Sequence, residues 1–135
     1  MRLLLLALLT SALLPFQVNA EEAKQAAPKP TIADFENARQ QVLDDPNNLE
    51  KRFQFAQLAS VMGKFDEAKD AYEFMLLTNP NLDRVKLELA MVEIRLGDLK
   101  KAKTLFEEVL AKNPPDAVKK NIQTVLQQVE QRALS

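Results

Sequence analysis

Few side chains in this chain could carry out acid–base, nucleophilic or metal chemistry. The sequence contains no His and no Cys, which removes the commonest general base, the thiol nucleophile and most zinc ligands. The carboxylates form adjacent pairs beside expected turns or on expected exposed helix faces, and we interpret them as solvated surface charge. These pairs are Asp44-Asp45, Asp66-Glu67 and Glu107-Glu108.

Hydroxyl nucleophiles and phosphate-binding loops are equally scarce. Beyond the first twenty residues the only serines are Ser60 and Ser135, and neither lies in a nucleophile motif. The chain has two glycines in all, so it contains no Gly-rich phosphate loop. We therefore predict a protein without catalytic activity, cofactor or metal, whose chemistry is that of a binding surface.

The spacing of helix-breaking residues indicates a repeat. Gly63 and Gly97 are 34 residues apart, and Pro46, Pro80 and Pro114 recur at the same interval. The 18 residues that begin at each glycine are also alike, GKFDEAKDAYEFMLLTNP and GDLKKAKTLFEEVLAKNP. A period of this length is typical of helical repeat architectures.

Each repeat divides into two helices around its glycine. Apolar residues recur at helical spacings on both sides of the glycine, which can end a helix because it tolerates positive φ. A proline then ends the second helix. In the first unit the apolar positions are Phe53, Phe55, Ala56, Leu58 and Ala59, then Phe65, Ala68, Tyr72, Met75 and Leu76. In the second unit they are Leu87, Leu89, Ala90 and Val92, then Leu99, Ala102, Phe106, Val109 and Leu110.

Half units flank the two repeats. Thr31 is the expected N-cap of a first helix, whose apolar residues are Phe35, Ala38, Val42 and Leu43. After Pro114-Pro115, Asp116 can cap a last helix that is apolar on one side and polar on the other. Such a helix suits the end of a stack. The sequence thus predicts an all-α fold with six helices.

These features resemble the tetratricopeptide repeat, a helix-turn-helix unit of 34 residues. The matching positions are Ala56 and Ala90, Gly63 and Gly97, Ala68 and Ala102, Tyr72 and Phe106, and Pro80 and Pro114. The chain departs from the pattern at Arg52 and Lys86, and again at Ala59 and Glu93. The resemblance implies a helical-hairpin solenoid of about two full repeats, flanked by half repeats and a C-terminal capping helix.

In tetratricopeptide domains the first helix of each unit lines the concave side, so the resemblance implies a partner-binding groove there. Its residues would be Phe53, Gln57, Arg84, Leu87, Met91, Ile94, Arg95, Asn121 and Val125. The apolar members could form an exposed partner site. Alternatively they could belong to the core, because a stack of so few repeats curves little and leaves only a shallow groove. Arg84 and Arg95 could bind a carboxylate of a partner or remain solvated.

A set of residues between Arg84 and Val129 is more specific than the general repeat. The set comprises the run Arg84-Val85-Lys86-Leu87-Glu88-Leu89-Ala90, then Gly97-Asp98, Phe106-Glu107, Asn113-Pro114-Pro115, Ala117-Val118 and Asn121-Ile122. It is similar to the N-terminal helical domain of the surface lipoprotein assembly modifier family. That resemblance implies a periplasmic domain that precedes an outer-membrane β-barrel and assists lipoprotein delivery. The sequence ends at Ser135 without barrel strands, so a separately encoded barrel or another client is expected.

The first twenty residues have the composition of a cleavable secretory signal. One positive charge, Arg2, precedes an apolar run from Leu3 to Leu14, and small residues mark cleavage after Ala20. The alternative is an uncleaved anchor helix, but the run is shorter than the ~20 residues that span a bilayer. We predict a signal peptide at 1–20, a flexible linker at 21–30 and a repeat domain at 31–135, with no membrane span after cleavage. Export places the domain in the periplasm.

Charge and composition narrow the choice of partners. The 18 basic and 19 acidic residues nearly balance, with no clustered basic face, so we predict no nucleic-acid partner. We predict a non-catalytic adaptor or chaperone that binds a protein or peptide of the cell envelope, such as an outer-membrane barrel or a lipoprotein client. The alternative is a structural subunit of a larger envelope complex or a self-associating scaffold. The oligomeric state stays open.

Overall fold

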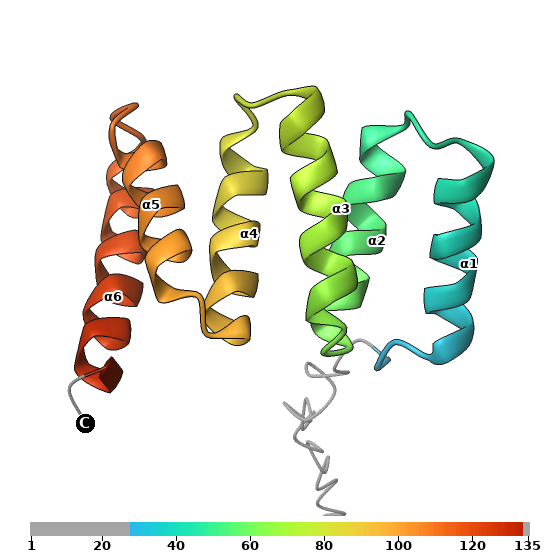
Figure 1. Ribbon diagram of the computed structural model, residues 1–135, viewed down its shortest axis with the longest axis horizontal. Helices are drawn as coiled ribbons and strands as arrows, with labels where there is room; N and C mark the ends of the chain where they lie inside the picture. The colour runs from blue at the N-terminus through green and yellow to red at the C-terminus, as the bar shows by residue number, and fades with distance from the viewer. Residues whose placement is uncertain (1–27, 134–135) are drawn as a thin grey trace, which may run out of the picture.

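The computed structural model describes residues 28–133, which form six helices. The helices are α1 (Ile32–Asp44), α2 (Leu49–Val61), α3 (Phe65–Thr78), α4 (Asp83–Leu96), α5 (Leu99–Leu110) and α6 (Asp116–Ala133). They stand side by side and run alternately up and down (Figure 1). No strand occurs in the part of the chain that the structure describes, and the all-α prediction is confirmed. The predicted signal peptide at 1–20, and residues 21–27 of the predicted linker, lie outside this range.

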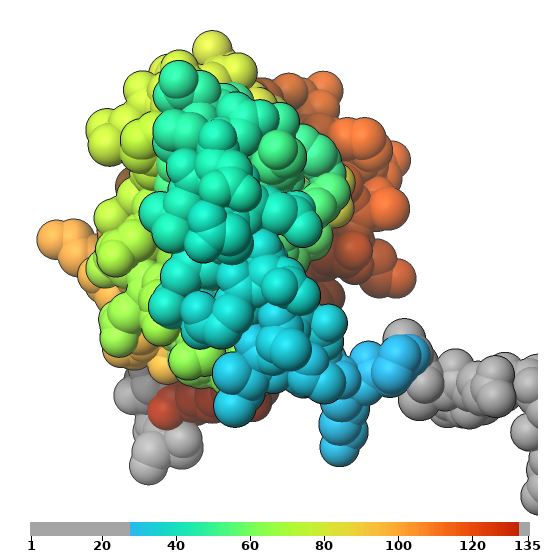
Figure 2. Space-filling model, turned by 90° about the vertical axis from the view of Figure 1, so that its right-hand side faces the viewer, coloured from blue at the N-terminus to red at the C-terminus, as the bar shows by residue number. Residues whose placement is uncertain are grey.

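The helices pair into hairpins that stack on one another. α2 packs against α3 and α4 packs against α5, while contacts between α3 and α4 join the two hairpins. α1 packs against α2 and covers one end of the stack, which Figure 2 shows from that end. α6 packs against α5 at the other end. This arrangement is the helical-hairpin solenoid that the sequence predicts.

Small side chains allow the helices to approach one another closely. Ala56, Ala68, Ala90 and Ala102 are all buried in the core. A larger side chain at such a position overpacks the interface at a cost of about 1–3 kcal/mol. The second helices of the two repeats carry an aromatic residue at the equivalent position, Tyr72 in the first repeat and Phe106 in the second. Both rings are buried in the same core as these alanines.

Both turn glycines adopt the left-handed conformation that the sequence predicts. Gly63 has φ 74° and Gly97 has φ 87°. An added Cβ would meet no atom within 4 Å at either position. Glycine is therefore required for its backbone conformation and not for space.

Three details of the helix ends bear on the sequence predictions. Thr31 caps α1 as predicted, because its Oγ1 accepts a hydrogen bond of 3.2 Å from the Asp34 N–H and its own N–H donates to Asp34. Asp116 was expected to cap the last helix, but it is the first residue of α6 and its carboxylate lies 3.3 Å from Lys119 Nζ. Leu43, expected on the apolar face of α1, is 65% exposed, because no helix covers that side of α1.

The outward face of α6 is polar where the equivalent face of α4 is buried. Leu89, Ala90 and Glu93 of α4 are buried between neighbouring helices. The residues 34 positions later in α6 are Gln123, Thr124 and Gln127, and all three are exposed. This face suits water, so α6 has the character of a capping helix.

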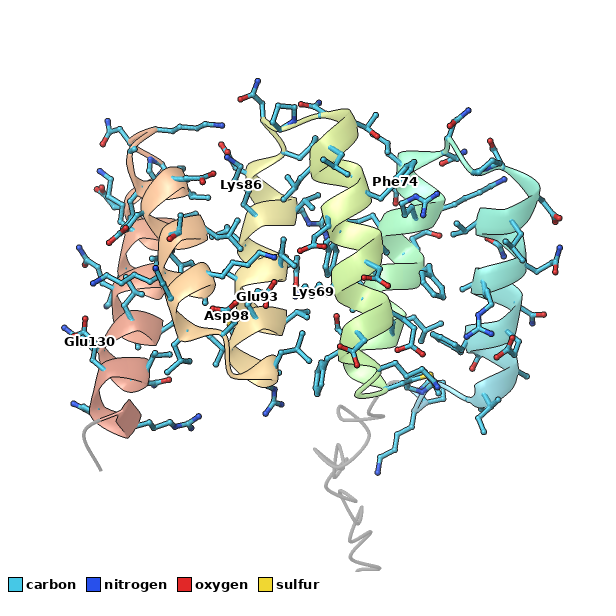
Figure 3. All side chains as sticks on the ribbon, viewed as in Figure 1. Lys69, Phe74, Lys86, Glu93, Asp98 and Glu130 are labelled. Atoms are coloured by element: carbon cyan, nitrogen blue, oxygen red, sulfur yellow. The ribbon has the colours of Figure 1, made fainter. Side chains whose placement is uncertain are left out.

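An ion cluster around a buried carboxylate joins the two hairpins. Glu93 of α4 is completely buried, and its Oε1 lies 2.8 Å from Lys101 Nζ and 3.5 Å from Lys69 Nζ. Lys69 belongs to α3 and Lys101 to α5, so the carboxylate is held from both sides. Figure 3 shows Lys69 and Glu93 facing each other between α3 and α4. Lys101 also contacts Glu73 of α3, which makes the cluster neutral overall.

Lys101 keeps its positive charge well above neutral pH. Burial alone lowers the pKa of Lys101, but contacts with Glu73 and Glu93 outweigh burial and the net pKa is raised above the ordinary lysine value. A group whose pKa is raised on folding stabilises the fold fully below its unfolded pKa and loses that effect as pH rises through the folded pKa. The contribution of Lys101 is therefore complete at neutral pH and lost only in strong alkali.

Replacing Lys101 by Met should destabilise the domain clearly at neutral pH. The substitution leaves the buried carboxylate of Glu93 with Lys69 alone. Because Lys101 is 36% exposed and partly screened by water, the cost should be about 1–2 kcal/mol, below that of breaking a fully buried pair. The free energy of unfolding in urea measures the effect. Lys103→Met is the matched control, because Lys103 is exposed and its Nζ lies 4.0 Å from Glu107, and it should change stability by less than about 0.5 kcal/mol.

A second substitution checks the cause. Glu93→Met combined with Lys101→Met removes both charges from the interior, and apolar replacement of a buried pair is often close to neutral. The double variant should therefore be more stable than Lys101→Met alone. If Lys101→Met and Lys103→Met unfold at the same urea concentration, the ion cluster does not hold α4 in place.

Candidate partner-binding surface

Hollows in the surface lie along both sides of α4, where it faces α2 and α6. One hollow of about 200 Å³ lies between α4 and α6 and is lined by Leu87, Met91, Phe106, Val118, Asn121, Ile122 and Val125. Asn121 is the only polar residue among them. Phe106 and Ile122 are buried, Leu87 and Val125 are half-buried, and Met91 is 45% exposed. The hollow is therefore an apolar site open to water.

A second hollow continues the first toward the C-terminal ends of the same two helices. It has a volume of about 210 Å³ and is lined by Met91, Ile94, Arg95, Val125, Gln128, Val129 and Arg132. Because Met91 and Val125 line both hollows, the two form one groove, which we call the α4–α6 seam. The seam is apolar at one end and carries arginines at the other.

The other side of α4, facing α2, is also hollowed. One hollow of about 180 Å³ is lined by Ser60, Val61, Phe65, Glu88, Met91, Val92 and Arg95. Another of about 350 Å³ lies further along and is lined by Leu49, Glu50, Phe53, Met75, Asn81, Leu82, Asp83, Arg84 and Val85. Met91 thus lies on a ridge between the α2 side and the α6 side. The first helix of each unit contributes to this surface, as the resemblance to tetratricopeptide domains implied.

Two arginines of α4 are held by aromatic rings. The Arg84 guanidinium carbon lies 4.4 Å from the centroid of Phe53, and that of Arg95 lies 5.7 Å from the centroid of Phe65. Within residues 28–133, no carboxylate lies at ion-pair distance from Arg84 or Arg95. Stacking on an aromatic ring limits where a guanidinium can point. Both cations therefore keep their hydrogen-bond donors available to a partner.

The structure gathers most of the predicted groove residues onto this surface. The predicted residues that line the seam are Leu87, Met91, Ile94, Arg95, Asn121 and Val125. Arg84 lines the hollow of about 350 Å³ on the α2 side. Phe53 is 6% exposed and packs against Tyr72 with 5.9 Å between ring centroids, so it is mainly core. Gln57 is half-buried and lines none of these hollows. Phe53 is therefore mainly a core residue, which was the alternative interpretation of these apolar positions, whereas Met91 is exposed to water.

Several residues of α6 that line the seam were not predicted as site residues. They are Val118, Ile122, Gln128, Val129 and Arg132. The helical periodicity of α6 placed Val118, Ile122 and Val129 on one apolar side, but that side was interpreted as a cap against the stack. No pattern in the sequence indicates that α6 packs loosely beside α4 and leaves a hollow between the two helices.

Tyr72 lies beneath the α2 side of this surface with a buried hydroxyl. The Oη atom has no hydrogen-bond partner among the described residues. Burial raises the pKa of Tyr72 to about 12, and the negative charge of Glu88 adds to the rise. The hydroxyl is therefore a neutral core group at physiological pH.

Other kinds of site are not found in the part of the chain that the structure describes. Residues 28–133 contain no group of three or more potential metal ligands. None of the helices described combines the length and the apolar character that crossing a bilayer requires.

Comparisons with known proteins agree with this architecture. Residues 61–126 match a family model described as a tetratricopeptide repeat. A similar solved structure is the crystal structure of PcrH in complex with the chaperone binding region of PopD, with a TM-score of 0.63 and 20% sequence identity. The similarity covers 75% of this chain and 79% of that one. No curated protein sequence matches the chain.

Residues 61–126 are therefore tetratricopeptide repeats, and the helices described around them continue the same helical-hairpin fold. At 20% identity the likeness to PcrH shows the shared fold alone. The more specific resemblance to the surface lipoprotein assembly modifier family is not confirmed by these comparisons and stays a prediction.

The titration of Tyr72 tests the packing beneath the surface. Tyr72 is the only Tyr and the chain has no Trp, so the tyrosinate absorbance band reports this side chain alone. Its pKa should be about 12 in the folded protein and about 10 in denaturant. A folded pKa raised in this way means that Tyr72 supports the fold fully below pH 10 and loses this support as pH rises toward 12.

Tyr72→Phe supplies the control. Phe106 stands at the equivalent position of the next repeat, so Phe should fit here and change stability by less than about 1 kcal/mol. The variant should also lose part of the alkaline destabilisation of the native protein. A folded pKa of about 10 would mean that the hydroxyl is solvated, and the packing of α2 on α3 would have to be revised.

Proposed function

We propose that the chain is a non-catalytic adaptor or chaperone of the periplasm that binds a segment of an envelope protein along the α2, α4 and α6 surface. The observation that carries the proposal is the α4–α6 seam, a hollow walled almost entirely by apolar side chains, with Met91 45% exposed at its rim. Exposed apolar patches of this kind often mark partner sites. Met91 at its rim is an adaptable contact for such a partner.

Two further observations support the proposal. PcrH, which shares this fold, has been crystallised with the chaperone binding region of PopD, so a stack of this type can hold a segment of another protein. The periplasmic location rests on the composition of residues 1–20, which has the charged start, apolar run and small residues of a secretory signal. The client we favour is an outer-membrane barrel or a lipoprotein, following the more specific family resemblance.

The second candidate is a structural role, in which the surface is filled by another copy of the chain or by a fixed subunit. Val61, which is 72% exposed, and Met91 lie on the same hollow beside α2 and would suit such a permanent contact. In that case the chain would be a scaffold of a larger envelope complex.

Photo-crosslinking in whole cells separates these candidates. A photoreactive residue at position 91 should form an adduct with one envelope protein, identified by mass spectrometry. Leu87→Glu should abolish the adduct, because it places a charge in the apolar part of the seam. Adducts of the chain with itself alone would contradict the adaptor proposal and support the scaffold.

Position 77 provides the matched control for the same experiment. Leu77 on α3 is 86% exposed and lines none of the hollows described above. A photoreactive residue there should give only background adducts. Equal adducts from positions 77 and 91 would mean that the α4–α6 seam is no specific site.

A further inference from the structure

The α4–α6 seam has two chemically different ends. Around Leu87, Phe106 and Ile122 it is an apolar hollow. At its other end it is lined by Arg95, Gln128 and Arg132. No acidic residue lines either part, although acidic residues slightly outnumber basic ones in the whole chain. A ligand that matches the seam must therefore carry both an apolar group and a negative charge.

The apolar end is shaped to hold one side chain. Its volume of about 200 Å³ is walled by α4 and α6, with the buried rings and methyls of Phe106 and Ile122 beneath. Burying an aliphatic or aromatic side chain there removes apolar surface from water on both partners. Asn121, exposed and lining the same hollow, can donate to or accept from a backbone group of the ligand.

The cationic end holds a guanidinium that the fold leaves without a carboxylate. Arg95 is exposed, and its stacking on Phe65 leaves its N–H groups unused by any acidic side chain of residues 28–133. Glu88 does not line the seam, but it lines the hollow on the α2 side together with Phe65 and Arg95, so Arg95 borders both hollows. An exposed guanidinium without an acidic partner can bind a carboxylate of a ligand.

The distance between the two ends sets the spacing within the ligand. Leu87 and Arg95 are eight residues apart on α4, which corresponds to about 12 Å along a helix. An extended chain covers the same distance in about four residues. Side chains four residues apart in an extended segment also point to the same side.

From these observations we infer that the seam binds an extended protein segment in which an apolar residue and an acidic residue stand about four positions apart. The apolar side chain fills the hollow beside Leu87 and Met91, and the carboxylate pairs with Arg95. This inference rests on the proposed function and gives its partner a chemical description. A segment with a basic residue in place of the acidic one would be repelled by the positive charge of Arg95.

Selection from a random peptide library displayed on phage tests the inference, with the full chain immobilised. The enriched peptides should carry an apolar and an acidic residue about four positions apart. The same selection on Arg95→Glu should lose the acidic residue and favour Lys or Arg at its position. Arg95 is exposed, so the variant should fold normally, which circular dichroism verifies.

Affinity measurements on one synthetic enriched peptide complete the test. Arg95→Gln should weaken binding by about two- to fivefold, as expected for an exposed ion pair, and added salt should reduce the difference. Lys103→Gln is the charge-matched control and should leave affinity unchanged. Leu87→Glu should weaken binding more than about tenfold, whereas Leu77→Glu should have no effect.

The outcomes separate the inference from the proposed function. Enriched peptides that lose binding in Leu87→Glu but ignore Arg95→Glu would overturn the acidic motif while leaving a peptide-binding surface. Selection of no peptide, or binding that survives Leu87→Glu, would overturn both.

Discussion

The buried carboxylate of Glu93 fixes the position of α4 and thereby the surface that α4 presents. A charge in the interior is tolerated only with partners close by, and here the partners come from the helices on either side, Lys69 of α3 and Lys101 of α5. A shift of α4 along either neighbour would separate the buried carboxylate of Glu93 from its two lysine partners. Leu87, Met91 and Arg95, which line the seam, are carried on this same helix.

α6 has two roles that follow from its two faces. Its outward positions Gln123, Thr124 and Gln127 are exposed and polar, which suits the end of a stack. Its inward positions, including Ile122 and Val125, close the core only partly and leave the hollow beside α4. One amphipathic helix thus caps the solenoid and forms a wall of its binding surface.

The fold was predictable from the sequence because its signals are local and periodic. Gly63, Gly97 and the prolines at intervals of 34 mark the ends of helices, and the alanines mark close contacts. The site was predictable only in part, since burial depends on how far each helix tilts toward its neighbours. Periodicity placed Phe53 on the groove face, although Tyr72 and the guanidinium of Arg84 cover it. Glu93 stood out only as a departure from the repeat, and no local signal paired it with lysines of two other helices.

The central claim is that a partner segment lies on α4 between α2 and α6. Methyl NMR of the full chain with 13C-labelled methionine tests it most directly, since Met91 lies on this surface whereas Met62 ends α2 beside the core and lines none of the hollows. On addition of the partner segment found by crosslinking, the Met91 methyl signal should shift while that of Met62 stays in place. A shift of Met62 with an unchanged Met91 signal would place the partner elsewhere and contradict the account.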